Sequence, residues 1–238
     1  MTFGKSSHTT SRVGLLLSGG LDSAILLSHF MKTARRVQPF YVQSGLFWEA
    51  PELRAVRDYL SAVATQQLSA VATQQLDPLV VLNLPLEDIY ENHWSVTGRD
   101  VPALDSADEA VFLPGRNPLL AIKAAFWCQL HGIRELALAT LSSDPFPDAT
   151  PAFFQELESV LQQALSAQLK LIRPFDGFDK RQVMELGREA PLELTFSCIA
   201  PIGDRHCGRC NKCGERQRAF RVAGRQDLTE YAVAVASK

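Results

Sequence analysis

Two groups of residues in this chain have types and spacings that could do chemistry. The first is a short loop at residues 18–23, which follows an apolar run and precedes an apolar-periodic segment beginning at Ala24. A buried strand, a tight turn and a helix start would present unpaired backbone N–H groups at the positive end of a helix dipole, which suits a phosphate-type anion. Gly19 and Gly20 can adopt backbone angles closed to other residues and let a ligand approach the main chain. The alternative is an ordinary strand–helix turn.

The second group consists of four cysteines near the C-terminus, spaced as Cys198-x8-Cys207-x2-Cys210-x2-Cys213. Closely spaced thiolates in turns suit tetrahedral zinc, whose structural sites are typically closed by four protein ligands. Disulfides and reactive thiols are the alternatives. The chain has five cysteines, which is an odd number, and four of them lie close together. In a reducing compartment, such a cluster favours metal binding over disulfides. We predict these four as zinc ligands and Cys128 as a buried thiol.

The elements that must position these groups follow from the alternation of apolar runs with helical segments. Strands are predicted at residues 12–17, 37–42, 79–84, 135–140 and 169–172. Helices are predicted at residues 24–31, 51–76, 119–130, from 151 onward, and 180–188, with a long irregular loop at 86–112. This order indicates an α/β fold: an open, mostly parallel, Rossmann-like five-stranded sheet with helices on both faces. Ligands of such sheets bind beyond the carboxyl ends of the strands, where residues 18–23, 43–48, 116–117 and 142–148 would meet.

We divide the chain into a polar tail at residues 1–11, a nucleotide-binding α/β domain at 12–190, and a zinc-binding segment with a C-terminal helix at 191–238. The predicted helix at 51–76 contains an identical tandem repeat of eight residues, at 60–67 and 68–75. At about 3.6 residues per turn, the second copy is rotated by roughly 80° and cannot present the same face. We interpret the repeat as a slipped duplication that lengthens a surface helix.

Composition narrows the class of protein. A chain of 238 residues can bury one substantial core, and a formal charge of −2 shows no basic excess, so we expect no general nucleic-acid surface. No apolar run approaches the roughly 20 residues of a membrane span, and residues 1–12 lack the apolar core of a secretory signal. We therefore expect a cytoplasmic protein without a membrane partner.

The loop at 18–23 lacks the lysine of a Walker A motif. It resembles instead the Ser-Gly-Gly-x-Asp-Ser loop of the PP-loop ATP pyrophosphatase superfamily, which stands complete here as Ser18, Gly19, Gly20, Leu21, Asp22 and Ser23. The resemblance implies that ATP is cleaved between its α- and β-phosphates, that a carboxylate or carbonyl oxygen is adenylylated, and that the loop holds the pyrophosphate leaving group.

Further segments extend the resemblance to one PP-loop family, the 7-cyano-7-deazaguanine synthases of queuosine biosynthesis. Residues 113–117 resemble its Pro-Gly-Arg-Asn segment, 146–148 its Tyr-Pro-Asp segment, and 197–216 its zinc segment. The resemblance implies ligation of 7-carboxy-7-deazaguanine with ammonia, with ATP activating first the carboxylate and then the amide to give the nitrile. It also implies a structural zinc ion and a homodimer.

The resemblance and the residue chemistry together assign roles. Arg116 suits the countering of phosphate charge, because its guanidinium fork matches phosphate geometry, and Asp22 suits Mg²⁺, which favours carboxylate and phosphate oxygens. We predict both as catalytic. The matching segments imply substrate contacts for Gln43, Asn117 and Asp148.

Several positions depart from the family pattern. Members usually carry a histidine in a Gln-x-His segment, which here reads Gln43-Ser44-Gly45. Ser142 replaces an aspartate, Thr150 replaces an arginine, and the Thr-Lys that opens the next helix appears as Asp179-Lys180. Lys123 and Lys180 are further candidates near phosphate, but we interpret both as solvated helix lysines. The departures fall near the expected substrate pocket, which is the pattern of a paralogue that keeps the activation chemistry and takes another carboxylate or amine.

Four functions are therefore compared. The first is the nitrile-forming ligase, and the second is a sister ligase with a different carboxylate and amine. The third is a non-catalytic nucleotide-binding module, against which the complete loop at 18–23 argues. The fourth is tRNA thiolation, which ranks low because four cysteines sharing a zinc ion would not be free to carry sulfur.

Overall fold

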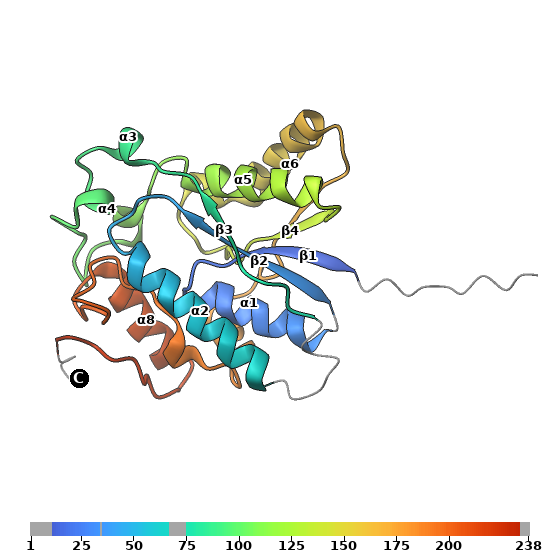
Figure 1. Cartoon of the computed structure of the whole chain (residues 1–238). Coiled ribbons are helices and arrows are strands. Elements are labelled where there is room, and N and C mark those ends of the chain that lie inside the picture. The colour runs from blue at the N-terminus through green and yellow to red at the C-terminus, as the bar shows by residue number, and fades with distance from the viewer. Residues whose placement is uncertain (1–10, 34, 67–74, 234–238) are drawn as a thin grey trace, which may run out of the picture.

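A five-stranded sheet forms the centre of the computed structural model, which describes residues 11–33, 35–66 and 75–233 (Figure 1). The strand order is β3-β2-β1-β4-β5, and every neighbouring pair is parallel. The strands are β1 (Arg12–Leu16), β2 (Arg36–Gln43), β3 (Val80–Asn83), β4 (Glu135–Ala137) and β5 (Lys170–Ile172). The predicted open α/β sheet is confirmed, and its strands are all parallel.

Helices connect consecutive strands, as parallel pairing requires. The α-helices are α1 (Leu21–Lys32), α2 (Glu49–Gln66), α3 (Glu87–Tyr90), α4 (Trp94–Thr97), α5 (Arg116–Leu130), α6 (Pro151–Leu165), α7 (Lys180–Leu186) and α8 (Asn211–Val222). Short 3₁₀ turns are η1 (Asp108–Val111), η2 (Pro147–Ala149) and η3 (Leu192–Leu194). Among the described residues, none of these helices combines the length and apolar character needed to cross a membrane.

Both faces of the sheet are buried, which explains the nearly continuous apolar runs of its strands. One core cluster lies between the sheet and α1, α2, α7 and α8, and a second lies under α5 and α6, on opposite sides of the sheet in Figure 1. Neighbouring residues of β2 alternate between them: Tyr41 belongs to the first cluster and Phe40 to the second. Gly14 in β1 allows α5 to approach closely, since a Cβ there would lie 2.7 Å from the Cys128 sulfur.

The long helix predicted at 51–76 is wrong at its last residue. Helix α2 is described as far as Gln66, residues 67–74 lie outside the described part of the chain, and Leu76 pairs with Val37 in an isolated parallel bridge. Asp77 follows and accepts hydrogen bonds from Arg12 and Arg36, which fixes the approach to β3. The second copy of the tandem repeat lies mostly outside the described residues, so its interpretation stays a prediction.

The segment at 86–112, predicted to be irregular, contains α3, α4 and η1. Together with the start of α2 it forms a third core cluster, which includes Trp48 and Val111 and encloses the four C-terminal cysteines. Helix α8 also contributes Ala219 and Phe220 to the cluster that contains β1. The C-terminal residues therefore share cores with the rest of the chain, and the division at residue 190 stays a prediction.

Candidate active site

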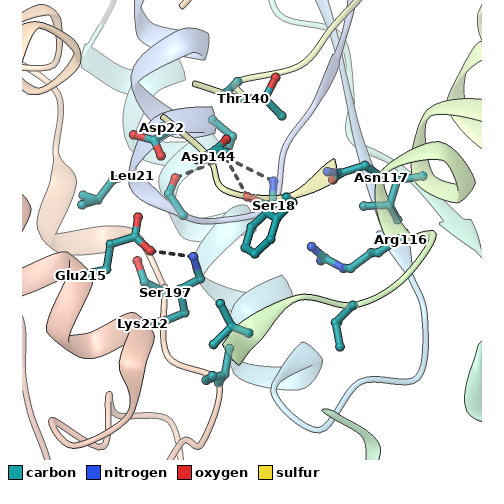
Figure 2. A pocket seen from close by; sticks show the side chains of 18 of the residues that line it. Ser18, Leu21, Asp22, Arg116, Asn117, Thr140, Asp144, Ser197, Lys212 and Glu215 are labelled. Atoms are coloured by element: carbon teal, nitrogen blue, oxygen red, sulfur yellow. Dashed lines mark hydrogen bonds and ion pairs between the residues drawn. The ribbon is translucent and has the colours of Figure 1, made fainter. Parts of the chain in front are cut away.

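A cavity of about 290 Å³ lies beyond the carboxyl ends of β1 and β4, the position expected for a ligand of a parallel sheet. Figure 2 shows side chains from distant parts of the chain that converge on it. Its polar lining includes Ser18, Asp22, Ser23, Glu52, Arg116, Asn117, Thr140, Asp144, Asp148, Lys180, Ser197, Lys212, Glu215 and Arg216. The loop at 18–23 and the cysteine segment, 180 residues apart, therefore border one cavity.

The loop at 18–23 is an open helix N-terminus whose shape is held by the Ser23 hydroxyl. The Ser18 backbone N–H donates to the Ser23 hydroxyl, which donates in turn to the carbonyl of Gly20, both at 3.2 Å. Gly20 is the N-cap of α1 and has no side chain to satisfy the free N–H groups of the first turn. Gly19 has a φ of +77° and packs against Glu52. The first turn of α1 is thus available to an anion.

A chain of alternating charges crosses the cavity. The Lys180 ammonium lies 2.8 Å from Asp22 and 3.3 Å from Glu215, and Glu215 accepts from Lys212 at 2.6 Å. Burial lowers the pKa of Lys180, but the carboxylates of Asp22 and Glu215 more than offset this and raise it above its ordinary value. The interpretation of Lys180 as a solvated lysine is wrong. Lys123 is exposed and does not line the cavity.

Arg116 brings a positive charge to the cavity and forms no close ion pair within the described part of the chain. It begins α5 directly after Gly115, and its side chain makes no hydrogen bond or ion pair with any of the described residues, although its Nε is buried. The neighbouring Asn117 donates from its backbone and its amide to the Asp148 carboxylate, at 3.3 and 3.1 Å. These three residues line the cavity, whereas Gln43, exposed at the end of β2, does not.

A buried carboxyl group that sequence reasoning missed lies beneath the loop. Glu52 lines the cavity and accepts a 2.7 Å hydrogen bond from the Tyr41 hydroxyl. Burial raises the pKa of Glu52 to about 8, although Arg116 acts in the opposite direction. Glu49, one turn earlier, accepts from the backbone of Ser44 and Gly45 and fixes the end of β2. The sequence feature that could have pointed to Glu52 is the spacing of Glu49 and Glu52, which lie at positions i and i+3 of one helix and therefore on the same face.

Aromatic rings form another part of the cavity wall. Trp48 stacks on Trp94 with centroids 5.9 Å apart, and Phe112 stacks on Phe146 at 5.5 Å. Phe196 also lines the cavity. Planar rings that line a cavity suit a flat, conjugated ligand, because offset stacking adds to the burial of apolar area.

The departures at Gly45, Ser142 and Thr150 make local contacts in loops and at a helix end. A side chain at Gly45, whose φ is +77°, would overlap the Glu87 carboxylate. The Ser142 hydroxyl donates to Asp176 at 2.5 Å, and Thr150 caps the N-terminus of α6. None of the three departing residues lines the cavity.

The four C-terminal cysteines are gathered into one buried cluster, with all sulfur atoms within 4.8 Å of one another. The sulfurs of Cys198 and Cys210 are 3.8 Å apart, and those of Cys207 and Cys213 are 3.9 Å apart. Tetrahedral ligands at about 2.3 Å from zinc would be separated by roughly 3.8 Å, so the donor set fits the ion. Backbone N–H groups of Ala200 and Cys207 donate to the Cys198 sulfur, as expected for a thiolate ligand.

His206, beside the cysteine cluster, and Cys128, in α5, both have buried structural positions. The Nε2 of His206 accepts a 3.0 Å hydrogen bond from the backbone N–H of Ser197. This contact orients the segment around Ser197, which borders the cavity. Burial lowers the pKa of His206 to about 3, so it is neutral at physiological pH. Cys128 is buried beside Gly14, as predicted.

The Glu52 carboxyl predicts a specific pH dependence. Its folded pKa of about 8 lies above the ordinary 4.5, so between these values the folded chain keeps a proton that the unfolded chain releases. Its contribution to stability therefore falls as pH rises from 5 to 8, by up to about 1.4 kcal/mol per pH unit. Glu52→Gln should lack this loss, so its free energy of unfolding should improve relative to wild type by on the order of 3 kcal/mol over that range.

Urea denaturation at pH 5, 6, 7 and 8 measures this difference. Glu156→Gln, at an exposed position of α6, is the matched control and should show no such trend. A Glu52→Gln difference that stays constant with pH would contradict the assignment.

The chain is similar over most of its length to one family of known proteins. The family model described as "Queuosine biosynthesis protein QueC" matches residues 12–224. The 7-cyano-7-deazaguanine synthase 1 of Desulfitobacterium hafniense is 30% identical, covering 89% of this chain and 92% of the relative. The 7-cyano-7-deazaguanine synthase of Methanothermobacter thermautotrophicus is 31% identical, covering 91% and 97%. A solved 4-thiouridine synthetase–RNA complex with bound ATP is 19% identical, with a TM-score of 0.48 over 90% of this chain and 50% of that chain. The chain belongs to the QueC family of queuosine biosynthesis proteins.

Proposed function

We propose that this chain is an ATP-dependent ligase that converts 7-carboxy-7-deazaguanine and ammonia into 7-cyano-7-deazaguanine. The names of its relatives support the product. The observation that carries the chemistry is the pairing, in one cavity, of the uncapped α1 N-terminus with the Arg116 guanidinium, which has no hydrogen-bond or ion-pair partner among the residues that the structure describes. A site that offers free backbone donors and a free cation is complementary to the polyphosphate of ATP.

The reaction requires two activations. The substrate carboxylate attacks the α-phosphorus of ATP, pyrophosphate leaves, and ammonia then displaces AMP to give the amide. The amide oxygen attacks a second ATP in the same way, and loss of AMP and protons gives the nitrile. In this scheme the residues at 18–23 hold the departing pyrophosphate, and Arg116 counters charge that develops at the phosphates.

Asp22 and Lys180 would change partners when ATP binds. Both carboxylate oxygens of Asp22 accept from Lys180, at 3.0 and 2.8 Å. A carboxylate beside phosphate oxygens fits Mg²⁺, which supplies charge neutralisation when it is bound. We propose that Asp22 turns to the ion and that Lys180 turns to the phosphates, so that both keep a counter-charge throughout.

The aromatic wall would receive the deazaguanine ring. Trp48, Trp94 and Phe112 line the cavity, and the Asn117–Asp148 pair offers polar groups at the same cavity. The departures at Ser142 and Thr150 serve a loop contact and a helix cap outside the cavity. These two departures therefore do not support the hypothesis that the chain uses a different carboxylate substrate. The sister ligase is the second candidate.

Zinc would have a structural role in this chain. Cys198, Cys207, Cys210 and Cys213 would hold it, and the ion would supply a rigid link between the segment at 198–207 and the start of α8. The cytoplasmic location, the homodimer and the use of ammonia remain part of the proposal.

The catalytic proposal is tested by incubating the purified chain with 7-carboxy-7-deazaguanine, ammonium and Mg-ATP, and measuring AMP and nitrile. We expect two AMP per nitrile. Arg116→Ala should lower the rate of AMP formation by about 100-fold or more, the usual effect of removing one transition-state donor. Arg134→Ala, at an exposed position outside the cavity, should retain the rate. AMP release with other deazapurine acids but not with this one would favour the sister ligase; release with none would refute the proposal.

Metal analysis tests the zinc site separately. Freshly purified, reduced protein should contain about one zinc ion per chain, because the donor set is closed by four thiolates. Cys210→Ser should lose the metal and lower the melting temperature, while Cys128→Ser should keep the zinc. Less than half an equivalent in the wild type would contradict this assignment.

A further inference from the structure

Lys212 occupies an unusual place, between two cysteines of the cluster and at the edge of the nucleotide cavity. Cys210 and Cys213 flank it in sequence, while its side chain lines the cavity with Ser197 and Glu215. Figure 2 shows Lys212 and Arg116 reaching the cavity from opposite sides. The segment proposed to bind zinc therefore delivers a cation to the site of ATP chemistry.

The backbone at Lys212 is firmly held. The Asn211 backbone N–H donates to the Pro102 carbonyl at 2.9 Å, and its buried side-chain amide donates to the Ser106 carbonyl at 2.8 Å. Gly214 packs so closely that a Cβ there would lie 2.7 Å from the Leu104 carbonyl oxygen. With cysteines of the cluster on either side, these contacts fix the point from which the Lys212 side chain enters the cavity.

The charges around Lys212 are balanced within the cavity. Glu215 contacts the Lys212 ammonium at 2.6 Å and the Lys180 ammonium at 3.3 Å, and Lys180 also contacts Asp22 at 2.8 Å. Two lysines and two carboxylates thus form one chain that ends in the first turn of α1. A polyanion at that turn would compete with the carboxylates for both ammonium groups, because phosphate oxygens are strong acceptors for charged donors.

We propose that Lys212 is a phosphate-contacting residue that acts with Lys180 as a pair of cations for the β- and γ-phosphates of ATP and for the departing pyrophosphate. Glu215 holds both lysines in place while the anion is absent. This inference rests on the proposed function, since it places the outer phosphates at the loop of residues 18–23. It also gives the cysteine segment a second task, which is to position a residue of the nucleotide site.

Calorimetric titration of the full-length, zinc-containing chain with Mg-pyrophosphate, and separately with AMP, tests the proposal. Lys212→Gln should weaken pyrophosphate binding about tenfold or more, as expected for a lost charge-assisted hydrogen bond, and should change AMP binding less than twofold. Lys212→Arg should recover part of the affinity. Arg209→Gln is the matched control, since Arg209 also lies between two cysteines but is exposed and outside the cavity.

Glu215→Gln supplies a second, opposite readout. Removal of the competing carboxylate should tighten pyrophosphate binding several-fold, whereas a purely structural role of Glu215 would weaken it or leave it unchanged. Unaltered pyrophosphate binding by Lys212→Gln, or an equal loss of AMP and pyrophosphate binding, overturns the assignment. Wild-type protein that binds neither AMP nor pyrophosphate would instead refute the proposed function, and the inference with it.

Discussion

The parallel pairing of β1 with β2 and β4 is the constraint on which the rest of this structure depends. It requires helical crossovers, buries both faces of the sheet, and brings the ends of β1 and β4 to one edge. At that edge the turn through Gly19 and Gly20 begins α1 without a side-chain cap. The free N–H groups of that turn favour a bound anion, and the other parts of the site are arranged around this place.

Among the described residues, four cations line the cavity; Arg216 is held by hydrogen bonds to Thr195, Ser197 and Leu192, and the other three come from three separate helices. Arg116 begins α5, Lys180 begins α7, and Lys212 lies in the first turn of α8. Arg116 has no counter-ion among the described residues, whereas the two lysines share carboxylates. In the proposed account, Arg116 can contact the phosphates of ATP directly, whereas Lys180 and Lys212 must first leave their carboxylate partners. The absence of a Walker lysine from the loop is thus offset by lysines from elsewhere in the chain.

Local patterns were enough to predict the sheet, the loop at 18–23 and the cysteine cluster, because each depends on residues close together in sequence. The partners of Asp22 could not be predicted in this way. Lys180 is 158 residues distant, and nothing in its own helix distinguishes it from a solvated lysine. The same holds for Glu52, whose burial depends on the packing of α2 over the loop. The predicted helix at 51–76 was wrong at Leu76, because the helical pattern of the repeat runs up to this residue, whereas Leu76 pairs with Val37 of β2.

Adenylylation of a carboxylate is the central claim, and the transfer of oxygen tests it most directly. The chain would be supplied with 7-carboxy-7-deazaguanine labelled with ¹⁸O in both carboxylate oxygens, with unlabelled ATP and ammonia, and the products examined by mass spectrometry. The account predicts one ¹⁸O in each AMP and none in pyrophosphate, because each oxygen leaves carbon on an α-phosphorus. Label in pyrophosphate or phosphate, or nitrile formation with unlabelled AMP, would contradict it.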